Sequence, residues 1–384
     1  MKYTIRILGV AILLLLAYLC FWPVPIDPAA WRPPQTPPFE GVYAANTLLA
    51  DTVRLGESDG VAPEDIAVDK EGSIYGGCED GRILCWDSEG KNVKVFADTG
   101  GRPLGLHFDY SGNLIVADSY KGLLSISNSG TITVLATECD SRPFGFTDDL
   151  DITKDGMIYF SDASWKYGQT MYQEDLMEHR PNGRLLRYDP RTGQTHLVVD
   201  NLYFANGVAV SPKQDFVLVN ETGKYRVMRY WLKGEKKGTV EKFISNLPGF
   251  PDGVSAGTEG VFWVALASPR DASLDSMLAW PFLRKVLVRL PKSFLPKPQE
   301  YSFVLGLNEK GEIVHNFQDP AGRYAPITSA EENNGYLYFG SILEKGFGRF
   351  QLPGKTPEPI AGMRLETPPR SSARGVQANP GNGL

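Results

Sequence analysis

The feature that most constrains the fold is a unit that returns six times from about residue 61 onward. Each unit holds a short polar lead-in, a strand, a glycine-containing turn, an aromatic-rich strand and a further strand. The copies begin APEDIAVDKEGSIYGG, RPLGLHFDYSGNLIVAD, FTDDLDITKDGMIYFSD, FANGVAVSPKQDFVLVN, FPDGVSAGTEGVFWVA and YAPITSAEENNGYLYFGS. Where no insertion intervenes, their spacing approaches the ~40–45 residues of a four-stranded blade. We therefore predict an all-β, six-bladed β-propeller over residues 45–353, with NTLLADTVRL supplying the strand that closes the ring.

One position of the unit is polar in four of the six copies. It lies eight residues before the turn glycine, and in the fourth copy, which lacks that glycine, matching NGVAVS to DGVSAG locates it. Around the ring the position holds Glu64, Leu104, Asp148, Asn206, Asp252 and Ile327. Because innermost strands start near the central axis, these side chains should face one another at the channel mouth. The alternative is that the acids only serve turns and strand entries.

Three carboxylates so close together would repel one another unless a cation lay between them. A hard divalent ion that takes 6–8 oxygen ligands removes that repulsion, and the lack of His and Cys at these positions disfavours zinc and copper. We predict one Ca²⁺ at the channel mouth, held by Glu64, Asp148, Asn206 and Asp252. Asp149 is expected to support the site or cap the turn, and Asp151 to be structural.

The two ends of the chain fall outside the repeat. Lys2 and Arg6 precede an apolar run over residues 7–22, which at ~1.5 Å per residue nearly crosses a bilayer core of ~30 Å. No small-x-small cleavage site follows, so residues 1–25 are predicted to be an uncleaved single-pass anchor that leaves the propeller on the exported side, periplasmic or luminal/extracellular. A cleaved signal peptide, with secretion, is the alternative. Residues 26–44 are a Pro-rich linker, and residues 354–384 are predicted to be disordered.

Charge and cysteine content exclude some functions. A net charge of -6 and a pI near 5.4 argue against nucleic acid as a partner, because phosphate binding needs a concentrated basic surface. Cys20 lies in the anchor, and Cys78 and Cys85 flank the turn EDGR, where either a disulfide or two buried thiols would fit. No C-x-x-C spacing indicates a zinc or redox site.

Several segments together resemble the superfamily of senescence-marker-type gluconolactonases, paraoxonases, strictosidine synthase and the strictosidine-synthase-like adipocyte plasma-membrane-associated proteins, most closely the last branch. They are RPLGLHFDYSGNLIVADSYKGLL, DDLDITKDGMIYFSDASWKYG, HRPNGRLLRYDPRTGQT, FANGVAVSPKQDFVLVNET and LPGFPDGVS. The resemblance spans roughly residues 46–353, and that branch also has an N-terminal anchor. It implies a calcium ion held by one Glu, two Asn-type ligands and one Asp; Glu64, Asn206 and Asp252 match, whereas Asp148 stands where Asn is usual.

Two departures narrow what the resemblance implies. Leu104 occupies the place of the paraoxonase histidine, and His107 lies on the strand that follows. Strictosidine synthase depends on a final-blade glutamate, to which the spacing of Glu331 and Glu332 does not secure a match. Strictosidine synthase activity is therefore not expected.

The function predicted from these residues is calcium-dependent hydrolysis of lactones or aryl esters, the ion polarising the carbonyl for attack by water. Asp252 is the first candidate for the general base, as the resemblance to gluconolactonases suggests, and Asp149 and His107 are further candidates. No G-x-S-x-G elbow supports a serine hydrolase. The alternative is a non-catalytic, calcium-stabilised propeller that binds a protein or small ligand at the cell envelope.

Two insertions are expected near the channel mouth. The third unit carries Trp165, Tyr167 and Tyr172, which could line an apolar pocket for the substrate. Residues 277–294 form an amphipathic basic stretch that could rest on an anionic membrane, cover the site as a lid, or pack against the propeller. Its apolar residues at helical spacing are Leu278, Phe282, Val286 and Leu290, and its basic ones are Arg284, Lys285, Arg289 and Lys292.

Overall fold

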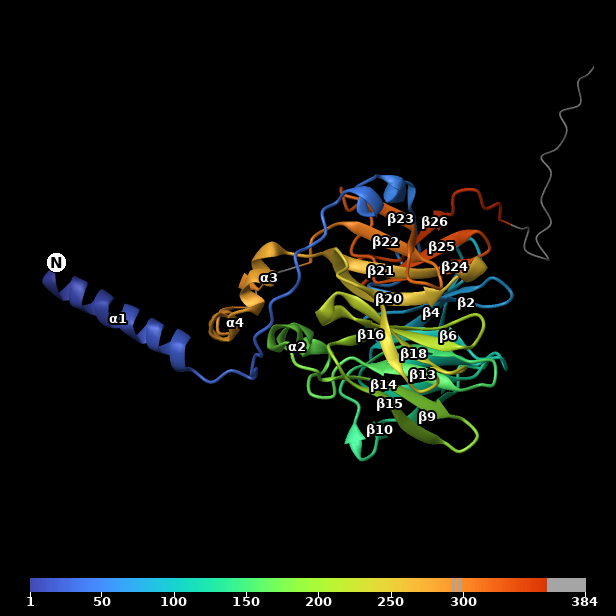
Figure 1. Cartoon of the computed structure of the whole chain (residues 1–384), viewed down its shortest axis with the longest axis horizontal. Coiled ribbons are helices and arrows are strands. Elements are labelled where there is room, and N and C mark those ends of the chain that lie inside the picture. The colour runs from blue at the N-terminus through green and yellow to red at the C-terminus, as the bar shows by residue number, and fades with distance from the viewer. Residues whose placement is uncertain (292–293, 296–297, 358–384) are drawn as a thin grey trace, which may run out of the picture.

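The computed structural model describes residues 1–291, 294–295 and 298–357, and its body is a ring of six four-stranded antiparallel sheets (Figure 1). The first blade contains β2 (Ile66–Val68), β3 (Ile74–Gly77), β4 (Arg82–Trp86) and β5 (Val93–Asp98). The second contains β6 (Pro103–Phe108), β7 (Leu114–Asp118), β8 (Gly122–Ile126) and β9 (Ile132–Ala136). The third contains β12 (Thr147–Ile152), β13 (Ile158–Asp162), β14 (Gly183–Asp189) and β15 (Gln194–Leu202). The next two contain β16 (Ala205–Val210), β17 (Phe216–Glu221), β18 (Arg226–Trp231) and β19 (Val240–Ser245); and β20 (Gly249–Ala256), β21 (Phe262–Pro269), β22 (Ser302–Leu307) and β23 (Ile313–Asp319). The short strands β10 (Glu138–Cys139) and β11 (Arg142–Pro143) form a separate hairpin.

The sixth blade closes the ring with strands from both ends of the propeller. It combines β24 (Ser329–Asn333), β25 (Tyr336–Gly340) and β26 (Phe347–Gln351) with β1 (Val53–Leu55). Val53 pairs with Arg349 and Leu55 with Phe347 in an antiparallel register. The six-bladed propeller is thereby confirmed, including the origin of its closing strand.

The turn glycines explain the fixed spacing of the unit. Gly72, Gly112 and Gly156 have φ values of 86°, 87° and 86°, a left-handed conformation that glycine adopts without steric cost. In the fourth blade Gln214 takes that place with a φ of 59°, eight residues after Asn206. The structure thus supports the alignment at the one copy whose sequence lacks the glycine.

The core lies between adjacent blades. Tyr75 and Ile83 of the first blade, for example, share a buried cluster with Leu114 and Leu124 of the second. Such packing fixes each innermost strand relative to the next, and so holds side chains at the channel in a constant arrangement. The four cysteines are unpaired, and Cys78 and Cys85 are buried thiols.

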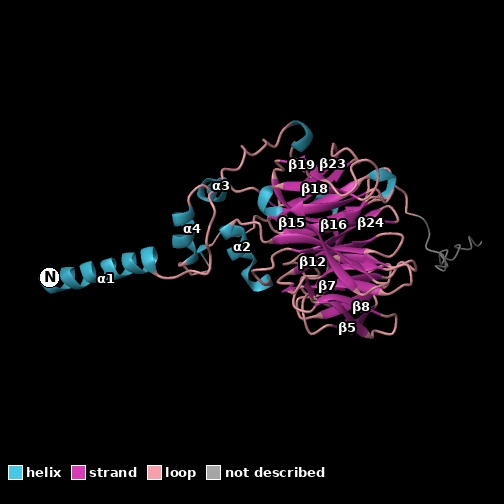
Figure 2. Cartoon of the chain, turned by 60° about the horizontal axis from the view of Figure 1, so that its bottom comes forward, coloured by secondary structure: helices cyan, strands magenta, loops and turns pink. Residues whose placement is uncertain are grey.

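Helices gather at one end of the propeller (Figure 2). α1 (Lys2–Phe21) extends away from the propeller, while α2 (Tyr172–Glu178), α3 (Ala272–Leu278) and α4 (Pro281–Val288) form what we call the cap. Single turns of 3-10 helix complete the regular structure: η1 (Gly41–Tyr43), η2 (Leu48–Asp51), η3 (Gln169–Met171), η4 (Thr222–Lys224) and η5 (Thr258–Gly260).

Within the amphipathic stretch expected over 277–294, the described residues contain the end of α3 and the whole of α4. Pro281 begins α4, where its missing N–H is tolerated, and Trp280 donates its N–H to Met277 O at 2.8 Å at the end of α3. Arg284, expected on a basic face, is buried and donates to Met177 O at 2.6 Å and Leu278 O at 3.0 Å. Lys292 lies outside the described residues, as do residues 358–384, most of the tail for which we predict disorder.

The Pro-rich linker runs along the cap. Ala29 N donates to Glu178 O at 3.0 Å and Trp31 N to Leu278 O at 2.9 Å. Trp31 also stacks on His179, with ring centroids 4.4 Å apart. These contacts connect α1 to the cap through an ordered segment.

Candidate functional site

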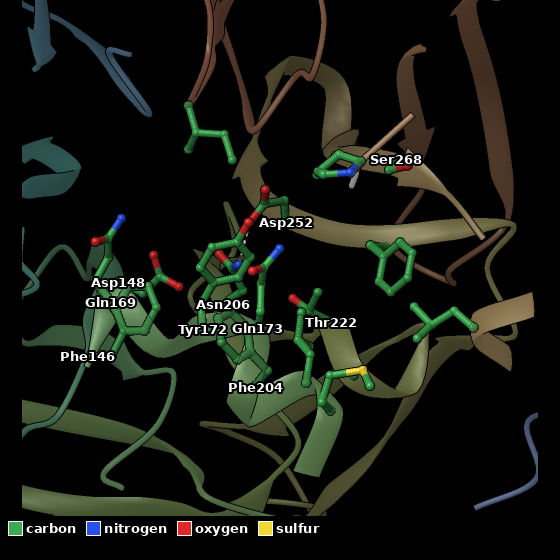
Figure 3. A pocket seen from close by; sticks show the side chains of 18 of the residues that line it. Phe146, Asp148, Gln169, Tyr172, Gln173, Phe204, Asn206, Thr222, Asp252 and Ser268 are labelled. Carbon is green, nitrogen blue, oxygen red and sulfur yellow. Dashed lines mark hydrogen bonds between the residues drawn. The ribbon is translucent and has the colours of Figure 1, made fainter. Parts of the chain in front are cut away.

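A cavity of about 350 Å³, which we call the capped cavity, lies between the starts of the innermost strands and the cap. Its polar floor is formed by Glu64, Asp148, Asn206 and Asp252, one from each of four blades. Figure 3 shows the last three of these side chains. Leu104, at the same position of the second blade, also lines it. Much of its wall is apolar, including Phe146, Tyr172, Leu176, Phe204, Phe250, Leu274, Leu278 and Leu295. The convergence expected from the repeat is present in the structure.

β-bulges turn these residues toward the axis. The register of the innermost pair shifts between Thr147 and Leu150, and between Ala205 and Val208. The same shift occurs between Pro251 and Val254 in the fifth blade. A bulge adds one residue to a strand and re-aims its side chains, so that two consecutive residues leave the regular pleat at each of these places.

The floor carboxylates strongly influence one another. Burial raises the pKa of Glu64 well above its usual value, and the neighbouring charge of Asp252 raises it further. The pKa of Asp148 is also raised well above its usual value, first by burial and then by the charges of Glu64 and Asp252. Burial raises the pKa of Asp252 to about 7, although the Asn206 amide, which donates to Asp252 Oδ1, acts in the opposite direction. These shifts express the cost of three buried like charges without a counter-ion.

Sequence reasoning missed two residues that act on this floor. Arg102 is buried, lines the cavity, donates to Gly77 O at 3.1 Å and interacts electrostatically with Glu64. Asn220 Nδ2 donates to Asp252 O at 2.6 Å and so positions the strand that carries Asp252. Arg102 lies two residues before Leu104, in the polar lead-in of the second unit. This place near the channel is the feature of the sequence that could have identified it. Asn220 lies on a second strand and has no such feature.

The floor fits a hard divalent cation. Asp148 Oδ2 is buried with no hydrogen-bond partner, and each of the four floor side chains can supply a carboxylate or amide oxygen to an ion. Three carboxylates and the Arg102 guanidinium leave two net negative charges, which a divalent ion would balance. Among the described residues, no group of three His, Cys, Asp or Glu side chains already has the spacing of a bound ion. The fit therefore rests on the donor types, the charge and the unpartnered oxygen.

The other candidates for the general base lie along a second cavity of about 320 Å³, the far cavity, toward the other end of the channel. Asp149 Oδ2 accepts from Val208 N at 2.7 Å, and Asp151 Oδ2 accepts from Val210 N at 2.7 Å. His107 Nε2 lies 3.5 Å from Asp151 Oδ1, and Glu331 is in the same cavity. Glu64 and Asn206 line both cavities, whereas Asp149 and His107 line only the far one.

Of the three aromatic residues expected at a pocket, Tyr172 lines the capped cavity. Tyr167 is buried elsewhere, donating to Pro25 O at 3.0 Å beneath the linker. Trp165 is 41% exposed and lies under the Arg142 guanidinium. The insertion thus supplies one wall residue of the three, Tyr172.

Comparison with known sequences shows the family of the chain. A family model described as strictosidine synthase matches residues 148–235, and one described as strictosidine synthase-like, N-terminal, matches residues 41–86. The adipocyte plasma membrane-associated protein of Bos taurus is 36% identical, with 91% of this chain and 88% of that protein covered. The chain belongs to this strictosidine synthase-like family. STRICTOSIDINE SYNTHASE-LIKE 6 of Arabidopsis thaliana, a further relative, is 37% identical over 76% of this chain and 79% of its own length.

Solved structures share the fold at low sequence identity. A gluconolactonase of Xanthomonas campestris has a TM-score of 0.59 and 16% identity, with 86% of this chain and 99% of that one covered. Regucalcin of Agrobacterium tumefaciens, described as a calcium-binding protein, has a TM-score of 0.55 and 14% identity, with coverage of 78% and 92%. At this identity the likeness shows the propeller fold alone.

Proposed function

We propose that this member of the strictosidine synthase-like family is a calcium-dependent hydrolase of lactones or aryl esters. The observation that carries the proposal is the floor of the capped cavity, where the buried carboxylates of Glu64 and Asp148, the half-buried carboxylate of Asp252 and an amide meet beneath apolar walls. Residues Glu64, Asp148, Asn206 and Asp252 would hold the ion. When bound there, calcium supplies Lewis-acid polarisation of an ester carbonyl.

The chain's own residues would bind and orient the substrate. Phe146, Tyr172 and Phe204 offer an apolar surface for an aryl or alkyl group, directly beside the polar floor. Residues of the cap line the cavity, and a substrate that displaced water there would strengthen electrostatic interactions inside it. Arg102 places a buried positive charge beside Glu64, where it limits the repulsion among the acids.

Asp252 is the first of the three base candidates. It lines the capped cavity, whereas the carboxylate of Asp149 is engaged with Val208 N and His107 faces Asp151 along the far cavity. A general base must come within hydrogen-bond reach of the water whose proton it takes. Asp252 meets this condition best, because it lines the cavity in which that water would lie.

Fold-level analogy points the same way, because one structural neighbour is a gluconolactonase and another a calcium-binding protein. α1 is apolar and long enough to cross a membrane over Tyr3–Phe21. We propose that it remains as an anchor and that the propeller lies on the exported side, in line with Lys2 and Arg6 at its inner end.

The test is an assay of the full chain in detergent against a panel of lactones and aryl esters, with calcium and with chelator. Asp252→Asn is the site variant, and Glu331→Gln, a buried carboxylate of the far cavity, is the matched control. Turnover that requires calcium, survives in Glu331→Gln and is lost in Asp252→Asn supports the proposal. Turnover that chelator leaves unchanged contradicts the metal role.

A second candidate function follows from the position of the bases. Since Asp149 and His107 lie outside the capped cavity, Asp252 would have to serve as both ligand and base. That favours, as the alternative, a propeller in which calcium only stabilises the ring while the capped cavity binds a ligand without turning it over. Calcium that raises the melting temperature, with no turnover of any ester or lactone in the panel, would select this candidate.

A further inference from the structure

The outer side of α4 and its N-terminal flank is an exposed apolar surface. Trp280 is 59% exposed, Phe282 55% and Leu283 47%. The opposite side of the same helix packs inward, where Leu287 and Val288 meet the buried Met177 and Ile26. These three side chains therefore keep about half of their surface in solvent, and large hydrophobic side chains that are neighbours on one surface indicate an interaction site. We call Trp280, Phe282 and Leu283 the outer surface of the cap.

The end of α1 is attached to this part of the cap. Arg289, directly after α4, donates from Nε to Trp22 O at 2.6 Å and from Nη1 to Leu19 O at 2.9 Å. Tyr18 Oη donates to Arg289 O at 3.0 Å. The last turn of α1 and the end of α4 are thus held together by three hydrogen bonds that bridge about 270 residues of sequence.

The direction of α1 fixes where a bilayer would lie. α1 has 20 residues, or ~30 Å at ~1.5 Å per residue, which is the thickness of a hydrocarbon core. None of its membrane-length segment is buried against the protein. It leaves from the side on which α4 lies and points away from the propeller in both views (Figures 1 and 2). A membrane that contains α1 must then end near Phe21 and Trp22, level with α4.

We propose that the outer surface of the cap rests in the interface of the bilayer that α1 spans. The occupant of this surface is the lipid itself, because the helix that would insert there is hydrogen-bonded to α4. Trp22 and Trp280 are aromatic residues of the kind that settle at the boundary between headgroups and acyl chains. Burial of the three cap side chains in lipid would add to the favourable free energy that the insertion of α1 supplies.

This docking has a consequence for the capped cavity. Leu274 and Leu278 of α3 line the cavity. α4, which carries the outer surface, belongs to the same cap, and the linker packs against both. The cap therefore has one side on the cavity and the other on the bilayer. A rotation of the propeller about α1 is also restricted, since contact at α4 adds a second point of attachment.

The experiment uses the full chain in phosphatidylcholine nanodiscs with an environment-sensitive NBD label at a single cysteine. The test position is Phe282→Cys, and the matched control is Tyr110→Cys, 67% exposed in the turn after β6 at the far cavity. Both carry Cys20→Ser, and the three remaining native cysteines are buried. A nitroxide quencher on the lipid acyl chain should quench the label at 282 several-fold more than the label at 110, with blue-shifted emission only at 282.

A second variant separates docking from mere proximity to the nanodisc. Arg289→Ala removes the two hydrogen bonds from its guanidinium to the end of α1, so quenching at 282 should fall toward the value at 110. Equal quenching at the two positions in the parent chain would overturn the proposal. A blue-shifted label at 282 that lipid-borne nitroxide does not quench would also overturn it, because a second copy of the chain or another protein would then cover the surface.

Discussion

Acidic residues of the channel lie at two neighbouring positions of the innermost strands, the first being that of Asp148 and the second that of Asp149. The carboxylates at these two positions have opposite roles. At the first position, Asp148 Oδ2 has no partner and faces the capped cavity. At the second, one residue on, Asp149 Oδ2 accepts from Val208 N of the next blade. Asp65 does the same in the first blade, accepting from Leu106 N at 2.9 Å. Of two consecutive carboxylates in one bulge, the first therefore points to the capped cavity and the second to the junction with the next blade.

The difference separates function from stability within a single cluster of charge. A carboxylate that accepts a backbone N–H across a blade junction contributes to the fold, because it satisfies a donor that has left the regular ladder. A buried carboxylate without any donor lowers stability, and is retained where it binds something. In other blades the second position is a glycine because the neighbouring blade leaves no room for a side chain. At Gly207, for example, an added Cβ would lie 2.3 Å from Val254 N.

The largest effect should come from the first position. Asp252→Asn removes one charge from the proposed ion site, and we expect calcium-dependent turnover to fall by ~100-fold or more. The melting temperature in chelator should rise, because one of three mutually repelling carboxylates is gone. Steady-state kinetics and thermal unfolding measure the two effects. If Asp252→Asn instead had a lower melting temperature in chelator, its carboxylate would stabilise the fold, which would contradict the difference between the two positions.

The second position should show the reverse pattern. Asp149→Ala leaves Val208 N without its acceptor, so the free energy of unfolding should fall by about 1–3 kcal/mol. Turnover per folded molecule should change little, since Asp149 does not line the capped cavity. Denaturant unfolding and an assay below the melting temperature check both parts. Full stability with lost turnover would instead make Asp149 a member of the site.

Gly207→Ala tests why some blades have no side chain at the second position. The new Cβ would meet only backbone, Val254 N at 2.3 Å and Asp252 O at 2.5 Å, so the strands must shift. We expect a loss of about 1–2 kcal/mol together with weaker calcium binding, because the shifted strand carries Asp252. Calorimetric titration and denaturant unfolding are the readouts. An unchanged variant would show that the junction is looser than the structure indicates.

The smallest effect concerns a buried carboxylate of the cap, Asp175, which belongs to neither position. Burial raises its pKa to about 7, although Ser164 and Asn182 donate to it. Because the folded protein holds this proton more tightly than the unfolded chain, the contribution of Asp175 to stability is complete below about pH 4 and is lost as the pH rises through about 7. Asp175→Asn should therefore flatten the fall in stability between pH 5 and 8. Parallel slopes for the two proteins would contradict this.

The repeat predicts the fold and the first position because both depend on spacing along the chain. Six equivalent units indicate a ring; Glu64, Asp148 and Asp252 follow from one count back from the turn glycine, and Asn206 follows from the match of NGVAVS to DGVSAG. The role of Asp149 as a junction between blades did not follow, because the bulge that separates it from Asp148 depends on pairing with a second strand. The break of the cap at Pro281 and the burial of Arg284 depend on packing between insertions that share no period with the repeat.

Calorimetric titration of calcium into the full chain in detergent tests the central claim most directly. One Ca²⁺ should bind per chain of wild type and of Glu331→Gln. Binding should weaken in Asp148→Asn, which keeps an oxygen ligand but loses one charge, and should be lost in Asp252→Asn. Equal affinity in all four proteins, or no binding to the wild type, would contradict an ion site at the first position of the innermost strands.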